Sequence, residues 1–380
     1  MLLAAALLSV PQPLALVFMQ SYHSLNPIFY YAATSISGLV NYMPVVFAAL
    51  ADITPPKYRA PSFGLTMASF YIAFSTSPYV VTLASKKKVV SMTSLFLAIF
   101  SCLFTLIFVP ETLPKDMSNS VGLQQREARI QNEYGMSMTK KLLLRPFRDL
   151  SILNRNKMSR IIAMMVVLSG MVYSSDSTVL LYYIENRLDF SAVDVARYFF
   201  VHGLCGIFVQ VYVLRALTGY VGERYVVIVA YVVGMFYNFL YGIASHKATI
   251  YAAAVFSALA SMGYPTVSSI NSYNGTPLEQ GLLQGALSSL GALSEAFGPM
   301  LMRLVYDRTK DGALFGAGTM FFLGTLFYCI GAFFAYLLPV DQANSKSIKK
   351  AVGLNQMVLL ENDHLYNGEE LSISDQSELA

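Results

Sequence analysis

The sequence predicts an all-α polytopic membrane protein with about ten transmembrane helices. Hydrophobic residues make up 55% of the 380 residues and charged residues only 13%, whereas about a quarter of a typical soluble domain is charged. The mean hydropathy is +0.52, and long apolar runs recur along the chain. Because a helix needs about 20 apolar residues to cross the hydrocarbon core of a bilayer, each run predicts one crossing.

Ten apolar segments divide the chain. In lipid each segment must be helical, because every backbone N–H and C=O group has to find its partner within the protein. The segments are residues 2–19, 28–50, 62–84, 89–109, 159–184, 192–214, 224–244, 247–268, 281–306 and 313–338.

A basic stretch separates the first four segments from the last six. Basic loops stay on the cytoplasmic side of a membrane, so this stretch fixes the orientation and an even number of crossings places both chain ends in the cytoplasm. The small net charge of +4 fits membrane orientation and argues against nucleic-acid binding. We expect an incomplete four-helix bundle over 1–109, a cytoplasmic loop over 110–158, a six-helix bundle over 159–339 and a disordered cytoplasmic tail over 340–380.

Four pairs of punctuating residues recur at one offset, 221 residues. They are Pro44 and Pro265, Pro56 and Pro277, Gly64 and Gly285, and Pro78 and Pro299. Weak internal symmetry of this kind indicates a duplicated helix bundle. Shifted back by the same offset, the second bundle would begin roughly sixty residues before Met1. We therefore expect a complete architecture of six plus six helices, of which this chain holds four plus six, lacking the first two.

The loop between the second and third segments has an unusual composition. The stretch "LADITPPKYRAPSFG", residues 50–64, combines an acid, three prolines and two bases. Asp52 stands at the C-terminal edge of a helix, where a carboxylate opposes the helix dipole and needs a cation. Lys57 and Arg59 follow closely and can supply one, while the prolines end the helix and stiffen the turn.

This loop resembles the corresponding loop of major facilitator superfamily transporters, in particular the tetracycline-resistance-type and hippocampus-abundant-transcript-like group. "VPETLPKD", "RALTGYVGERYVV" and the long stretch from "YPTVSS" to "AFGP" resemble the same group, at residues 109–116, 215–227 and 264–299. The resemblance extends from Leu2 to about Pro339. It implies a two-half helical bundle in which Asp52, Arg59 and Gly64 form a cytoplasmic loop motif that latches the halves. It also implies a helix-packing motif of Pro78, Gly298 and Pro299, although serines replace the family's glycines around Pro78.

Polar side chains inside the apolar segments are candidates for a solute or proton pathway, because their cost in lipid has to be offset by a function. The candidates are Asp176, Glu295, His202, Asn238, Asn41 and Tyr173. If protons are coupled to transport, Asp176 or Glu295 would carry them, since burial favours the neutral form of a carboxyl group.

Each candidate has a structural alternative. Asp176 can be hydrated near a membrane surface, and Glu295 can pair with Arg303. His202 can simply pack in the core. Asn41 and Asn238 can form hydrogen bonds between helices.

These patterns predict a secondary active transporter of a small solute by alternating access, with or without proton coupling. A receptor or scaffold that kept the fold and lost transport is the alternative, and an incomplete gene record would explain the missing helices. No enzymatic or nucleotide-binding motif is present, so we expect no catalytic residue, cofactor or metal. The expected partners are a solute and the lipid bilayer, and we expect a monomer. Plasma membrane and endomembrane remain open as locations.

Overall fold

The computed structural model describes most of the chain. The described residues are 1–22, 25–83, 87–110, 150–276, 279–312 and 316–339. Within these ranges the ordered structure is helical and contains no strand. Most of the expected central loop and all of the expected tail lie outside the described residues, so both domain assignments stay predictions. Met1 to Leu338 form one compact unit.

The helices before the central loop, called here the first half, follow the first four apolar segments. Pro11 and Pro13 lie in the first turn of a new helix, so the first segment is divided into two. The second segment is likewise interrupted between Gly38 and Asn41. The helices are α1 (Leu2–Ser9), α2 (Pro11–Ser21), α3 (Ile28–Ser37), α4 (Tyr42–Ile53), α5 (Arg59–Leu83) and α6 (Lys87–Phe108), with a 3₁₀ turn, η1 (Pro56–Tyr58).

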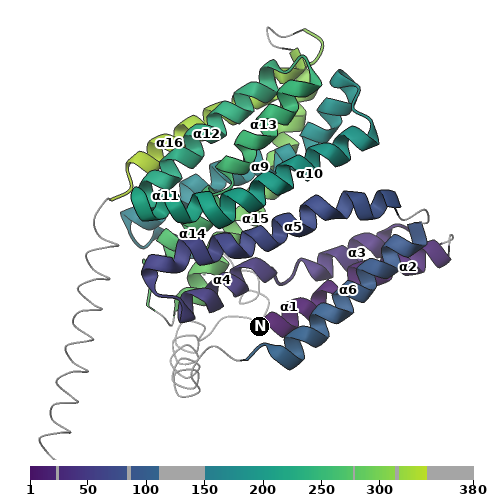
Figure 1. Ribbon diagram of the computed structural model, residues 1–380, viewed down its shortest axis with the longest axis horizontal. Coiled ribbons are helices and arrows are strands. Elements are labelled where there is room, and N and C mark those ends of the chain that lie inside the picture. Colours follow the sequence, from purple (N-terminus) through teal and green to yellow (C-terminus); the bar gives the residue numbers. More distant parts are fainter. Residues whose placement is uncertain (23–24, 84–86, 111–149, 277–278, 313–315, 340–380) are drawn as a thin grey trace, which may run out of the picture. The chain divides into compact units, whose positions relative to one another are not determined.

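The helices after the central loop, called here the second half, follow the last six segments (Figure 1). The helices are α9 (Lys157–Leu188), α10 (Ala192–Phe208), α11 (Leu214–Tyr220), α12 (Glu223–Ile243), α13 (Lys247–Ala260), α14 (Gly263–Ser272), α15 (Gln280–Thr309) and α16 (Thr319–Tyr336). A π-helical turn, η3 (Val209–Val213), joins α10 to α11, and the 3₁₀ turns η2 (Leu150–Asn154) and η5 (Gly316–Gly318) precede α9 and α16.

Eight helical stretches within the described ranges are long and apolar enough to cross a membrane. Helices α5 and α15 are not among them, although they have 25 and 30 residues. Their serine, threonine, glutamine and glycine content lowers their hydropathy. A helix of 20 residues spans about 30 Å, so both are long enough, and their polar residues indicate that they face protein or a polar path.

Helix boundaries recur at the offset that the prolines and glycines predicted. Helix α1 begins at Leu2 and α12 at Glu223, α4 at Tyr42 and α14 at Gly263, and α5 at Arg59 and α15 at Gln280; each pair is 221 residues apart. The broken pair α3–α4 corresponds to the broken pair α13–α14. The repeat therefore extends from sequence punctuation to the three-dimensional elements.

The two halves meet through the central helices. Helix α5 packs on α10 and α14, and α4 packs on α15, while α15 also packs along α9, as Figure 1 shows for α5 beside α10. The contacts α5–α14 and α4–α15 are equivalent under the repeat. The main apolar core lies among α9, α12, α13, α15 and α16, and a smaller core in the first half contains Phe47 and Phe63, whose rings stack 4.3 Å apart.

The outer face of α6 consists of exposed aromatic side chains. Phe96, Phe100, Phe104 and Phe108 follow one another at four-residue spacing and are each about half exposed or more. Neighbouring rings of this series lie 5.0–6.4 Å apart. Such a face is unfavourable in water and favourable against lipid chains, which fits the membrane assignment.

Gly298 lets α15 approach α9 closely. A Cβ atom at this position would lie 2.7 Å from the Met171 Cα atom, inside van der Waals contact. Small residues at helix contacts are the usual means of close packing in membranes, where apolar burial supplies no driving force between helices. Pro78 and Pro299 both lie inside their helices, α5 and α15.

We expect Gly298→Ala to destabilise the protein by about 2 kcal/mol, because the added methyl group overpacks the α9–α15 contact. Thermal unfolding in detergent would report this as a lower Tm. The matched control is Gly285→Ala in the same helix, where a Cβ atom meets nothing within 4 Å; this change should be neutral or slightly stabilising, since alanine favours helix. Equal Tm values for the two variants would contradict the packing role of Gly298.

Candidate functional site

Arg59 joins the end of α4 to the second half. Its guanidinium group donates hydrogen bonds to the Ala51 carbonyl at 2.9 Å and the Thr54 carbonyl at 3.2 Å. These carbonyls belong to the last turn of α4, where helix carbonyls lack partners. A third hydrogen bond, of 3.0 Å, reaches the Ser272 hydroxyl at the end of α14. Asp52 acts electrostatically on Arg59 from the same turn of α4.

Tyr273 and Glu223 complete the contact around Arg59. The Tyr273 hydroxyl lies 2.7 Å from the Pro56 carbonyl and 3.0 Å from Glu223 Oε1, and can donate to either. Ser269 donates a further hydrogen bond of 2.8 Å to Glu223, and the Arg59 guanidinium lies 5.7 Å from the Tyr273 ring centroid. We call Arg59, Glu223, Ser272 and Tyr273 the Arg59 cluster. It is the polar link between the loop motif and the second half.

The sequence analysis did not select Glu223 or Ser272. Glu223 is the first residue of α12, where a carboxylate is favoured by the helix dipole. The helix dipole alone accounts for an acid at this position and gives no sign of its contact with Tyr273. Gly64, the third residue of the loop motif, lies against η3: a Cβ atom there would lie 3.1 Å from the Gln210 carbonyl oxygen. It therefore permits α5 to approach the π-helical turn.

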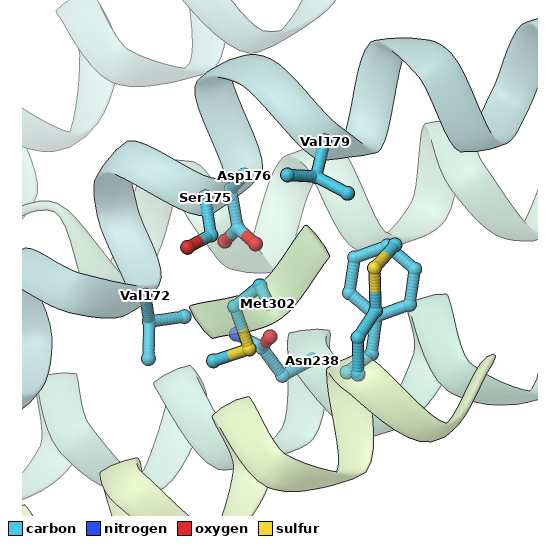
Figure 2. A pocket seen from close by; sticks show the side chains of 8 residues that line it. Val172, Ser175, Asp176, Val179, Asn238 and Met302 are labelled. Atoms are coloured by element: carbon cyan, nitrogen blue, oxygen red, sulfur yellow. The ribbon is translucent and has the colours of Figure 1, made fainter. Parts of the chain in front are cut away.

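Asp176 and Asn238 come together inside the second half. Tyr237 on α12 donates a hydrogen bond of 2.8 Å to the Asp176 carboxylate, and its hydroxyl lies 3.0 Å from that of Tyr328 on α16. A cavity of about 10 Å³ opens beside the carboxylate. Figure 2 shows Asp176 on α9 directed toward Asn238, with Met302 between the helices. Asp176 is partly exposed at this position, so the hydrated alternative for Asp176 stays open.

The hydroxyl groups next to Asp176 are mostly engaged within their own helix. Ser175 donates to the Met171 carbonyl at 2.6 Å, and Thr178 donates to the Ser174 carbonyl at 2.9 Å. Ser174 instead reaches across to α15 and donates to the Glu295 carbonyl at 2.6 Å. These serines and threonines therefore satisfy backbone oxygens and tie α9 to α15.

Glu295 lies on an exposed face of α15. Its carboxylate acts electrostatically on the hydroxyl groups of Tyr173 and Tyr264, which are 52% and 39% exposed. The expected alternative, an ion pair with Arg303, is wrong. Arg303 binds Asp307 at 2.9 Å, and its guanidinium lies 4.2 Å from the Tyr182 ring centroid. Eight residues of helix separate Glu295 from Arg303 by about 12 Å, which is too far for a direct pair.

His202 is surrounded by aromatic rings at the contact of α10 with α5. Its Nδ1 atom lies 3.2 Å from the Ala254 carbonyl, and the rings of Tyr71, Phe74 and Tyr198 lie 5.6–6.1 Å from its own. This environment matches the packing alternative for His202.

Asn41 has two roles at the start of α4. Its side-chain oxygen accepts a hydrogen bond of 3.1 Å from the Met43 amide and so caps the helix. Its amide nitrogen donates a hydrogen bond of 3.0 Å to Ser288 on α15. Asn41 therefore links the halves as an interhelical hydrogen bonder, the alternative expected for it.

Arg155 and Glu279 form an ion pair that fixes η2 to the start of α15. Their charged atoms lie 3.0 Å apart, and Glu279 also accepts a hydrogen bond from the Thr276 amide. Partial burial works against ionisation of Glu279, but the hydrogen bonds from Thr276 and Arg155 outweigh it and hold the pKa of Glu279 below its ordinary value.

Because its pKa is lowered in the folded protein, Glu279 contributes stability that is present above its ordinary pKa of 4.5 and is lost as the pH falls through the folded value. We expect wild type to exceed Glu279→Gln in Tm at pH 7 by a small amount, since the pair is partly exposed to solvent. The difference should shrink toward zero below pH 4.5. The other acids titrate equally in both proteins, so their effects on Tm cancel in the difference between wild type and Glu279→Gln. A difference in Tm that does not change with pH would therefore contradict this role of Glu279.

No metal centre is found in the described ranges, where no group of three His, Cys, Asp or Glu side chains is placed to hold an ion. Cys102, Cys205 and Cys329 are free. Among the described residues, three polar features are candidates for transport: the Arg59 cluster between the halves, the Asp176 cavity inside the second half, and Glu295 on the open face of α15.

Curated proteins with similar sequences include a hippocampus abundant transcript-like protein and a tetracycline resistance protein. The chain is 25% identical over 289 residues to hippocampus abundant transcript-like protein 1 of Bos taurus, covering 74% of this chain and 54% of that protein. It is 23% identical over 310 residues to the class H tetracycline resistance protein of Pasteurella multocida, covering 80% and 72%. The chain thus spans little more than half the length of the hippocampus abundant transcript relatives.

Solved structures with the same fold are also transporters. The human organic anion transporter MFSD10 (TETRAN) superposes with a TM-score of 0.68 at 22% identity, covering 88% of this chain and 83% of that one. The fucose:proton symporter of E. coli gives a TM-score of 0.62 at 13% identity, covering 90% and 83%. The Major Facilitator Superfamily model matches residues 1–299. With this match over most of its length, and with the repeated membrane helices described above, the chain belongs to the major facilitator superfamily.

Proposed function

We propose that this protein is a secondary active transporter that carries a small solute across a membrane by alternating access. The observation that carries the proposal is the Arg59 cluster, in which a few polar contacts hold the two halves together. Similar proteins with known structures include an organic anion transporter, a fucose:proton symporter and a xylose:proton symporter. A small organic solute is therefore the substrate class to test.

The Arg59 cluster is suited to a reversible closure. Its cross-half contacts are the Arg59–Ser272 hydrogen bond and the Tyr273–Pro56 hydrogen bond. In alternating access the halves rock against each other around a fixed site, so contacts at one end must break while those at the other end form. Hydrogen bonds contribute about 1 kcal/mol each, so breaking two of them is a barrier that solute binding can overcome.

Glu295 is the better placed of the two acids to exchange protons. Its side chain is exposed on α15 beside Tyr173 and Tyr264, whereas Asp176 is only partly exposed and accepts a hydrogen bond from Tyr237. An acid that is open to water in one state and covered in another binds its proton more tightly when covered. Closure over Glu295 would then couple proton uptake to the movement of the halves.

The topology and assembly follow from the same proposal. Both chain ends and the Arg59 cluster lie on the cytoplasmic side, as the basic central stretch predicts. The transporter works as a monomer, since the solute path runs between its own halves. Its membrane is either the plasma membrane or an internal membrane.

We expect Glu295→Gln to remove the pH dependence of solute uptake, because glutamine cannot exchange a proton. Uptake of fluorescein, L-fucose and D-xylose would be measured in proteoliposomes at pH 5.5 to 8. The matched control is Glu185→Gln, which removes an exposed acid from α9 and should leave the profile unchanged. Uptake by Glu295→Gln that still follows pH as in wild type would rule out Glu295 as the proton carrier.

We expect Arg59→Gln to shift the protein toward the state in which the Arg59 cluster is open. Spin labels would be attached to Tyr58→Cys and Tyr220→Cys in a protein whose three native cysteines are changed to serine. The two labels report the distance between η1 and the end of α11. A larger fraction of Arg59→Gln molecules than of wild-type molecules should show the longer distance. The control is Arg215→Gln, which removes an exposed charge from α11 and should leave the distances as in wild type. Identical distance distributions in all three proteins would show that the cluster is no latch.

A further inference from the structure

The Asp176 cavity combines features that point to a bound ion. It lies among α9, α12, α15 and α16 and has a volume of about 10 Å³, which is near the smallest space that holds one water-sized particle. Apolar side chains form most of its wall, and its polar groups come from Ser175, Asp176 and Asn238 (Figure 2). The polar groups thus come from α9 and α12, which approach each other at this small space.

The carboxylate of Asp176 has no cationic partner among the residues the structure describes. The titratable groups that face it from the neighbouring helices are tyrosines: Tyr237 donates to it directly, and Tyr328 hydrogen-bonds to Tyr237. Helix α15 contributes the thioether of Met302 to the cavity. The Asn238 amide acts on the carboxylate as a second neutral donor. A partly buried carboxylate with only neutral donors beside it still favours a positive charge or a proton.

Asn238 adds a buried oxygen that accepts no hydrogen bond from the described residues. Its side chain is 1% exposed, and its amide nitrogen donates to the Gly234 carbonyl at 3.4 Å. Its Oδ1 atom makes no hydrogen bond in the described structure. Gly324 on α16 leaves the space next to this atom free, since a Cβ atom there would lie 2.5 Å from it. A buried acceptor without a donor is costly, and a cation would satisfy it.

We propose that Asp176 and Asn238 bind a monovalent cation of the size of sodium in this cavity. A single carboxylate balances one positive charge, whereas divalent cations recruit more carboxylates and six or more oxygen ligands. The small volume favours sodium over the larger potassium ion. Ser175 can add its hydroxyl oxygen, because donation to the Met171 carbonyl leaves its lone pairs available.

This site differs from the proposed proton carrier. Glu295 lies on the exposed face of α15, whereas the cavity is enclosed by four helices of the second half. Cation binding at Asp176 can therefore be measured without solute and without transport. Absence of pH-dependent uptake would contradict the proton role of Glu295, whereas absence of sodium binding would contradict the cation site at Asp176.

The test is the thermal unfolding of the purified full chain in detergent at constant ionic strength. Replacing choline chloride by sodium chloride should raise the Tm by about 3 °C or more, because a ligand that binds only the folded state stabilises it. Potassium chloride should give a smaller rise. Asp176→Asn and Asn238→Leu should lose the sodium effect, and Glu295→Gln should keep it.

Binding of ²²Na⁺ to wild type keeps the proposal testable even if the cavity variants do not fold. Saturable binding competed by lithium but not by choline would support the site. Absence of saturable binding, an equal rise in Tm in all three salts, or an undiminished sodium effect in Asp176→Asn would each overturn it. A Tm that follows pH but not sodium would assign a proton to Asp176 and would equally overturn the cation site.

Discussion

Every polar group that this chain places inside its helices must find a partner within the protein. With 13% charged residues and a bilayer around it, the chain cannot rely on water for this purpose. The constraint explains why buried hydroxyl groups bond to carbonyls of their own helix, as Ser175 does, and why Arg59 takes two carbonyls at the end of α4 before it reaches the second half. The polar interactions that join the two halves, such as the Arg59–Ser272 hydrogen bond, are where function is to be sought.

The helical architecture was accessible from the sequence because hydrophobicity and punctuation are local signals. Long apolar runs predicted the helices, and the offset of 221 residues predicted which helix starts correspond. Interruptions were less accessible. Proline marked the break between α1 and α2. The break between α13 and α14 directly precedes Gly263 and Pro265, yet residues 247–268 were predicted as one uninterrupted segment. The number of membrane crossings, with α5 and α15 less apolar than the rest, stays a prediction.

The candidate site was only partly accessible, because pairing between distant segments depends on packing. The sequence identified Asp176 and Asn238 separately, but it could not show that α9 and α12 bring them to one cavity. It also offered an ion pair of Glu295 with Arg303 as the alternative to a pathway role; two helical turns of separation prevent this pair, and Asp307 is the actual partner of Arg303. Glu223 was not predicted, because its contact with Tyr273 depends on the packing of α12 against α14, which no local sequence signal reveals.

The two acids of the second half differ in environment, and this difference separates their chemistry. Glu295 is open on α15, so its protonation can follow the water on the side to which the protein is open. Asp176 lies among four helices of the second half and meets a tyrosine hydroxyl group and an amide, so a cation bound there would stay as long as the four helices remain packed. A group that exchanges with each conformational change is suited to coupling, and one that stays is suited to holding the bundle together. Under the two proposals, the cation would stabilise the second half, and the Arg59 cluster would supply the contacts that change as the first half moves against it.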